Sequence, residues 1–102
     1  MSNTIFEKLG KELIVKPEGR LDAVASPVLE KEMEPYLDAA QDITMDFANV
    51  EYISSGGMRV LLATEQRMED RGGSLRLTHV NEHILEVFEL VGFMDIVNVE
   101  ES

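Results

Sequence analysis

The sequence predicts a single α/β domain spanning residues 1–102, with a mixed, mostly parallel sheet of about five strands and helices packed on it. Two observations lead to this prediction. Short apolar runs alternate with longer amphipathic segments, and glycine, proline and asparagine separate them at intervals that suit strands followed by helices. The 102 residues, 44% of them hydrophobic, are also enough for one core and too few for two domains.

The N-terminal segment is predicted to form a β-hairpin. Residues 4–9 are typical of a strand, Gly10 of a turn, and the run Leu13 to Val15 of a second strand. Proline cannot donate a hydrogen bond to a neighbouring strand, so we expect a bulge or an edge at Pro17 before the strand resumes at Arg20.

The first helix is expected to begin at Ser26, with Ser26 as its cap and Pro27 in its first turn. Apolar residues then recur at helical spacing: Val28, Leu29, Met33, Tyr36 and Leu37. Pro35 should kink this helix or mark its last turns, because proline removes one backbone hydrogen bond.

A strand, a tight turn and a second helix follow. The strand is indicated by Ile43, Met45 and Phe47, after which Val50 to Ile53 lead into the turn Ser54-Ser55-Gly56-Gly57. The predicted helix ends near Gly72, and its apolar stripe comprises Met58, Leu61, Leu62 and Met68.

The C-terminal part is predicted as strand, helix and short strand. Leu75, Leu77 and His79 alternate as a strand, and Asn81 caps a helix that Gly92 ends. The buried stripe of that helix is expected to comprise Ile84, Val87, Phe88 and Val91, and the last strand Ile96, Val97 and Val99.

The balance of 20 acidic against 9 basic residues gives a formal net charge of -11. Such a charge repels phosphate backbones and anionic lipids, so we expect no direct nucleic-acid binding, no membrane insertion, and a protein partner with a basic surface whose binding weakens as salt rises. The absence of cysteine excludes disulfides and thiolate chemistry. We expect a cytoplasmic protein without a cofactor, a metal or catalytic residues.

The turn from Ser54 to Gly57 is the place where function is expected, because ligands of open α/β sheets gather where strands end and helices begin. For an arbitrary sequence, a purely structural role with a capping serine and two turn glycines is the more common explanation. A phosphate-cradling loop would need a lysine here, and a hydrolase elbow would need a glycine two residues before the serine. Asp46 lacks the acidic pair of a phospho-accepting aspartate, and we expect it to cap the following turn.

Three blocks of the chain resemble the STAS domain of bacterial anti-sigma factor antagonists. They are Glu18-Gly19-Arg20-Leu21-Asp22-Ala23, Ser26-Pro27-Val28-Leu29-Glu30, and the run from Asp46 to Leu62, which contains Ser54-Ser55-Gly56-Gly57. The resemblance covers nearly the whole chain, and the last block is the specific one. It implies a STAS-type α/β domain with helices on a mixed sheet.

The resemblance also implies a partner-switching function without catalysis. Members of the family bind an anti-sigma factor serine kinase and thereby release a sigma factor for transcription. The kinase phosphorylates a serine at the start of the second helix, and a metal-dependent, PP2C-type phosphatase removes the phosphate. Alignment without gaps implies Ser55 as the acceptor, while Ser54 and Gly56 replace an acidic and a hydroxyl residue of the family pattern, which leaves Ser54 as an alternative acceptor.

Asp22 matches an acidic residue that the family carries beside the phosphorylation site. It either orients the serine or contacts the kinase, or it only caps the loop before the first helix. Met58 also fits the core stripe of the helix, and Arg59 is expected to be an exposed contact. The predicted partner-binding residues are Asp22, Ser54, Gly56, Gly57, Met58 and Arg59. The alternative function is a STAS subunit of a lipid-transport complex or sensory scaffold without a phosphorylation switch.

Overall fold

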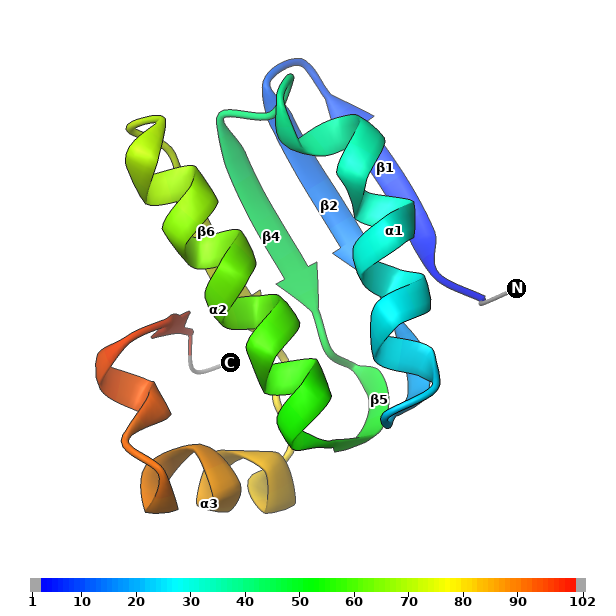
Figure 1. Ribbon diagram of the computed structural model, residues 1–102, viewed down its shortest axis with the longest axis vertical. Coiled ribbons are helices and arrows are strands. Elements are labelled where there is room, and N and C mark those ends of the chain that lie inside the picture. Colours follow the sequence, from blue (N-terminus) through cyan, green and yellow to red (C-terminus); the bar gives the residue numbers. More distant parts are fainter. Residues whose placement is uncertain (1–2, 101–102) are drawn as a thin grey trace.

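The computed structural model describes residues 3–100 and has a five-stranded sheet at its centre (Figure 1). Its strands lie in the order β1-β2-β4-β6-β7. Only the β1–β2 pair is antiparallel, and the other pairs are parallel. The strands are β1 (Ile5–Leu9), β2 (Glu12–Lys16), β4 (Asp42–Asp46), β6 (Ser74–Thr78) and β7 (Asn98–Val99). The predicted N-terminal hairpin and mostly parallel sheet are confirmed.

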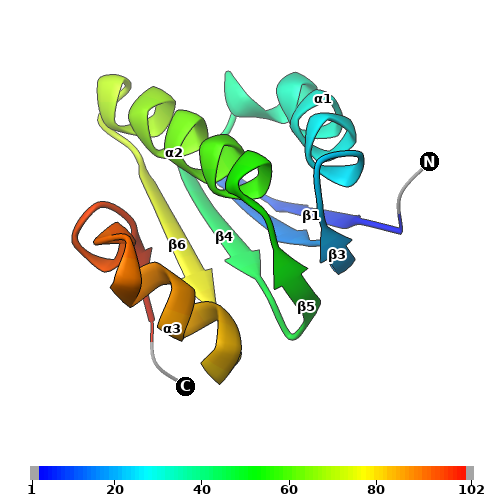
Figure 2. The same cartoon turned by 60° about the horizontal axis from the view of Figure 1, so that its bottom comes forward.

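A second, two-stranded sheet consists of β3 (Glu18–Leu21) and β5 (Asn49–Ile53), which run parallel (Figure 2). The expected break at Pro17 is present, and a register shift follows between Gly19 and Arg20. Strand β5 was not predicted as a separate strand, because residues Val50 to Ile53 were expected only to lead into the turn. Across this pair, the Arg20 guanidinium lies 4.3 Å from the centre of the Tyr52 ring.

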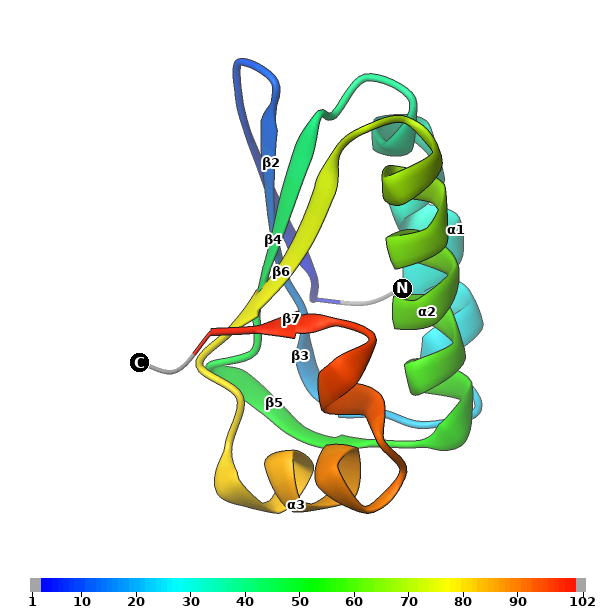
Figure 3. The ribbon, with the colours of Figure 1, turned by 90° about the vertical axis from the view of Figure 1, so that its left-hand side faces the viewer.

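Two helices, α1 (Ala25–Leu37) and α2 (Ser55–Asp70), cover the same face of the main sheet (Figure 3). Helix α3 (Glu82–Leu90) lies at one end of the molecule next to β5, and the 3-10 turn η1 (Phe93–Asp95) follows it and contacts α3 and β7. Helix α3 packs against β5 of the two-stranded sheet, outside the face that α1 and α2 cover. The opposite face of the main sheet carries no helix of residues 3–100.

The core lies between the main sheet and helices α1 and α2. Each central strand turns every second side chain toward the helices, as its burial pattern shows: Leu13 and Val15, Ile43 and Met45, Leu75 and Leu77. The helices contribute Leu29, Met33 and Leu37 from α1, and Leu61 and Met68 from α2. Each fully buried side chain of this size stabilises the fold by about 1.5–3 kcal/mol.

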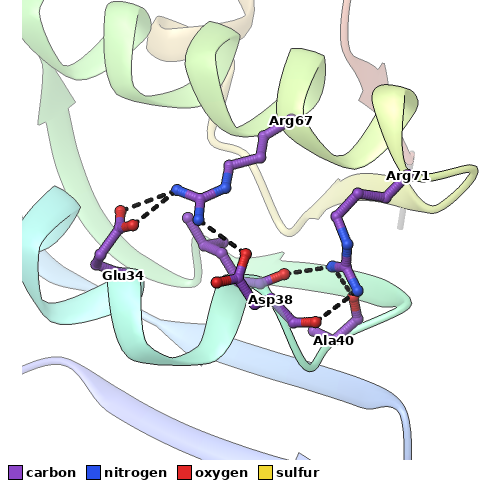
Figure 4. Close-up of polar contacts among 6 residues, drawn as sticks. Glu34, Asp38, Ala40, Arg67 and Arg71 are labelled. Carbon is purple, nitrogen blue, oxygen red and sulfur yellow. Dashed lines mark hydrogen bonds and ion pairs between the residues drawn. The ribbon is translucent and has the colours of Figure 1, made fainter.

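Two arginines join the C-terminal ends of α1 and α2: Arg67 in the last turns of α2 and Arg71, the residue after α2 (Figure 4). Arg67 binds both carboxylate oxygens of Glu34, at 2.9 and 3.0 Å, and an Asp38 oxygen at 2.9 Å. Arg71 donates to the backbone carbonyls of Leu37, Asp38 and Ala40. The guanidinium of Arg71 thereby satisfies carbonyls that the end of α1 leaves without helical partners.

Four local predictions were wrong. Ser26 is not the cap of α1, because the helix begins at Ala25 and the Asp22 carboxylate accepts hydrogen bonds from the preceding turn. Val91 is 58% exposed instead of buried, because α3 ends at Leu90 and Gly92 turns the chain away with a φ of 73°. The last strand contains only Asn98 and Val99, and His79 lies beyond β6 with a φ of 56°.

Candidate functional site

The predicted site is built around the backbone carbonyl of Leu21, the last residue of β3. This oxygen accepts three hydrogen bonds: from the Ser54 amide at 2.9 Å, from the Ser54 hydroxyl at 2.8 Å and from the Ser26 hydroxyl at 3.2 Å. One carbonyl thus ties together the end of β3, the first turn of α1 and the start of α2.

Ser54 is the N-cap of α2. Its hydroxyl oxygen accepts a hydrogen bond from the Gly57 amide at 3.2 Å while the hydroxyl proton is donated to Leu21. The Ser54 side chain is half-buried, and its hydroxyl proton is already used in the hydrogen bond to Leu21. Replacing such a cap by alanine typically costs about 1 kcal/mol.

Ser55 is the first residue of α2 and lies exposed at the surface. Within residues 3–100, its hydroxyl has no hydrogen-bond partner. The two neighbouring serines therefore differ: Ser54 holds the turn together, and Ser55 presents a hydroxyl to the solvent.

The two glycines of the turn also differ from each other. A Cβ on buried Gly57 would lie 2.6 Å from Cγ1 of Ile53 and 3.0 Å from the Leu21 carbonyl oxygen, so the close approach of α2 to β3 and β5 requires glycine. A Cβ on Gly56 would meet nothing closer than 3.5 Å, and its neighbours are the side chains of Ser54 and Ser26. The fold does not require glycine at position 56.

Asp22 caps the loop that precedes α1. Its Oδ1 accepts hydrogen bonds from the amides of Ala25 and Val24 at 2.9 and 3.0 Å, and these bonds hold the pKa of its carboxyl below the ordinary value. Its backbone carbonyl shares the single hydroxyl proton of Ser26 with the Leu21 carbonyl, and the distances from Ser26 Oγ to the two oxygens are 2.7 and 3.2 Å. The structural role considered for Asp22 is thus present. It places Asp22 next to Leu21, whose carbonyl holds Ser54.

A groove with a volume of about 310 Å³ separates the N-terminal ends of α1 and α2. Its charged residues are Glu30 and Arg59, and its other lining residues are Ala23, Ser26, Pro27, Ser55, Gly56 and Val60. Ser55 and Arg59 are both exposed on this groove, whereas Met58 is partly buried against the core, as expected. The groove brings together two of the predicted binding residues with the predicted acceptor.

Sequence reasoning missed Ser26, Pro27, Glu30 and Val60 as neighbours of the turn. The signal for Ser26 was present but was interpreted as a helix cap. In the structure Ser26 is a buried residue of the first turn of α1: only 1% of it is exposed, and its hydroxyl donates to the backbone carbonyl of Leu21.

Residues 3–100 contain neither a candidate metal site nor a candidate membrane-spanning helix. A wider open depression lies over β3 and β5, with Glu18 and Glu51 as its charged residues. Residues 3–100 contain no group of three or more histidine and acidic side chains placed to hold a metal ion. No helix in that range is long and apolar enough to span a membrane. Asp46 binds the Ala48 amide at 2.9 Å, which confirms its role in the following turn.

Comparisons with known proteins match nearly the whole chain. A family model described as "Mlab, STAS domain" matches residues 6–98. The anti-sigma-B factor antagonist of Staphylococcus aureus is 31% identical over 86% of this chain and 82% of its own length. The anti-sigma-B factor antagonist of Bacillus subtilis is 27% identical over 86% of this chain and 81% of its own length.

A solved structure agrees with the fold. The Bacillus cell fate determinant SpoIIAA in its phosphorylated form superposes with a TM-score of 0.77 at 17% identity, over 97% of this chain and 90% of SpoIIAA. At that identity the likeness shows the fold alone. The family model and the Staphylococcus relative go further, and together they show that the chain belongs to the STAS domain family.

Proposed function

We propose that this protein is an anti-sigma factor antagonist: it binds an anti-sigma factor serine kinase, releases the sigma factor that the kinase holds, and catalyses nothing itself. Two relatives that match more than four-fifths of their own length support this, because both are named anti-sigma-B factor antagonists. The predicted binding residues Asp22, Gly56 and Arg59 surround the start of α2, where the groove offers a shaped contact surface.

We further propose that phosphorylation of Ser55 ends this binding. The carrying observation is that the Ser55 hydroxyl is exposed and without a partner in the described chain, whereas the Ser54 hydroxyl is half-buried and donates to Leu21. In the transfer, the Ser55 oxygen forms a bond to the γ-phosphorus of ATP, the bond from that phosphorus to ADP breaks, and the hydroxyl proton leaves. A PP2C-type phosphatase reverses the modification by hydrolysis.

The phosphate acts at the contact surface and leaves the fold intact. At the first turn of a helix, a phosphate is favourable by about 0.3–1 kcal/mol. Buried in an interface against an apolar or acidic surface, the same charge costs several kcal/mol, and about 1.4 kcal/mol weakens binding tenfold. It adds only about -1.5 to -2 to a net charge of -11, so the location of the charge decides the effect.

Calorimetry with the anti-sigma kinase of the same organism tests the proposal. The unphosphorylated protein should bind, and the protein carrying phosphoserine at position 55 should bind at least about 100-fold more weakly. Binding of the unphosphorylated protein should also weaken from about 50 to 300 mM salt, because an acidic domain meets a basic partner. Equal affinity of both forms would contradict the switch, and no binding by either would contradict the antagonist function.

The second candidate is a STAS subunit of a lipid-transport complex or sensory scaffold without a phosphorylation switch. Gly56 favours it, because it has no hydroxyl where the family pattern has one, and the matching family model is described as Mlab. Affinity purification from the native host decides between the two: a transporter ATPase as the main captured protein supports the second candidate, and a serine kinase supports the first.

A further inference from the structure

Arg59 differs from the other arginines of the chain in having no partner in the described structure. Four arginines are engaged: Arg20 with the Tyr52 ring, Arg67 with Glu34 and Asp38, Arg71 with carbonyls of α1, and Arg76 with Thr44 and Glu100. Arg59 makes no hydrogen bond or ion pair with any of residues 3–100. Its guanidinium is therefore available to bind an anion at the groove.

Arg59 lies four residues after Ser55 on α2, and both line the same groove. Residues at this spacing are neighbours on a helix surface, with Cβ atoms about 5–6 Å apart. An anionic side chain four residues before a cationic one is the more favourable order of such a pair. In the unmodified chain, position 55 is an uncharged serine, so Arg59 has no anion to bind there.

We propose that Arg59 is the intramolecular counter-ion of phosphorylated Ser55. This inference rests on the phosphorylation of Ser55 proposed above. The phosphate brings three acceptor oxygens and about -1.5 to -2 charges, and a guanidinium binds such a group through paired N–H donors. Phosphorylation therefore has two effects on the contact surface: it adds negative charge, and it withdraws an exposed cation from the partner.

Glu30 is the other charged residue that lines the groove, and its negative charge opposes the placement of a phosphate there. It comes from α1 and forms no ion pair with Arg59 in the unmodified chain. Its charge raises the pKa of a nearby phosphate, whereas Arg59 lowers it. The variant Glu30→Gln separates these two contributions.

The test uses full-length protein in which phosphoserine is placed at position 55 by genetic encoding, so that no kinase is needed. Phosphorus NMR then measures the second pKa of the phosphate, ordinarily about 6. Ion pairing with Arg59 should lower it by about 0.2–0.4 units relative to the Arg59→Gln variant, since such a pair contributes about 0.2–0.5 kcal/mol and one pKa unit corresponds to about 1.4 kcal/mol. Arg59→Lys should keep part of the lowering, because it retains the charge and loses the paired donors.

Lys11→Gln is the matched control. It removes the same charge from an exposed residue in the β1–β2 turn, at the opposite end of the sheet from the start of α2 (Figure 1). The control should leave the phosphate pKa within about 0.1 unit of the parent, because salt screens so distant a charge. Equal pKa values in the parent and Arg59→Gln, or equal shifts in Arg59→Gln and Lys11→Gln, would overturn the proposal. Neither result depends on whether a kinase modifies Ser55.

Discussion

Replacing each turn glycine by alanine should change stability in opposite directions. At Gly57 the added Cβ would lie 2.6 Å from Ile53 Cγ1 and 3.0 Å from the Leu21 carbonyl. Overpacking of this kind costs about 2–3 kcal/mol, against a gain of up to about 1 kcal/mol from helix propensity. We expect Gly57→Ala to lower the free energy of unfolding by about 1–2 kcal/mol.

At Gly56 the nearest atom to the added Cβ is Ser54 Oγ at 3.5 Å, which is an ordinary contact. Gly56→Ala should therefore raise the free energy of unfolding by about 0.5–1 kcal/mol, because alanine loses less backbone freedom on folding.

Urea unfolding measures both variants against the parent, with the midpoint shifting and the slope unchanged. Thermal unfolding should show the same order, with about 4–8 °C for each kcal/mol. Equal shifts of the two variants in the same direction would refute the argument from packing. A Gly57→Ala protein as stable as the parent would also refute it, because the Leu21 carbonyl and Ile53 would then leave room for a Cβ at position 57.

Three further predictions concern charged groups. Arg71→Gln should lower the free energy of unfolding in urea by about 1–2 kcal/mol, because the carbonyls of Leu37, Asp38 and Ala40 lose their donor. Arg71→Lys should restore only part of this stability. An Arg71→Gln protein as stable as the parent would contradict the capping role. Glu65 has a raised pKa because of burial and the nearby Glu69, and one of its oxygens is buried without a partner, so stability is lost as pH rises through its folded pKa. Water still reaches the Glu65 carboxyl and weakens this effect, so Glu65→Gln should stabilise by only about a few tenths of a kcal/mol at pH 7 and by less near pH 4. Exposed Glu69→Gln should change stability less, and a pH-independent effect of Glu65→Gln would contradict this. The pKa of Asp22 is lowered by the Ala25 and Val24 amides, so its contribution is present above the unfolded pKa and is lost as pH falls through the folded one. The stability difference between the parent and Asp22→Asn should shrink on acidification below about pH 4, and a difference that stays constant with pH would contradict it.

Most of the fold could be predicted because its signals are local. Leu13 and Val15 alternate as a half-buried strand does, and Asn81 accepts the Ile84 amide at 2.8 Å as a helix cap does. The β3–β5 pair could not be predicted in the same way. Its register joins Leu21 to Ile53 across 32 positions, and no pattern in either short segment indicates that partner.

The candidate site shows the same division. The turn and its two serines could be found from the sequence, but the difference between Ser54 and Ser55 depends on the Leu21 carbonyl, 33 positions before Ser54. Ser26 was misassigned because serine followed by proline is typical of a helix start, while the amides of that turn are satisfied by Asp22. Where two side chains can perform the same local task, tertiary contacts decide which of them does.

The difference between the two serines can be tested by mapping the phosphorylated residue. The protein is incubated with the anti-sigma kinase and ATP, and intact mass and fragment spectra are recorded for the parent, Ser54→Ala and Ser55→Ala. We predict one phosphate on Ser55 in the parent and in Ser54→Ala, and none in Ser55→Ala. A phosphate on Ser54, or its persistence in Ser55→Ala, would contradict the assignment of Ser55 as the exposed acceptor and Ser54 as the structural cap.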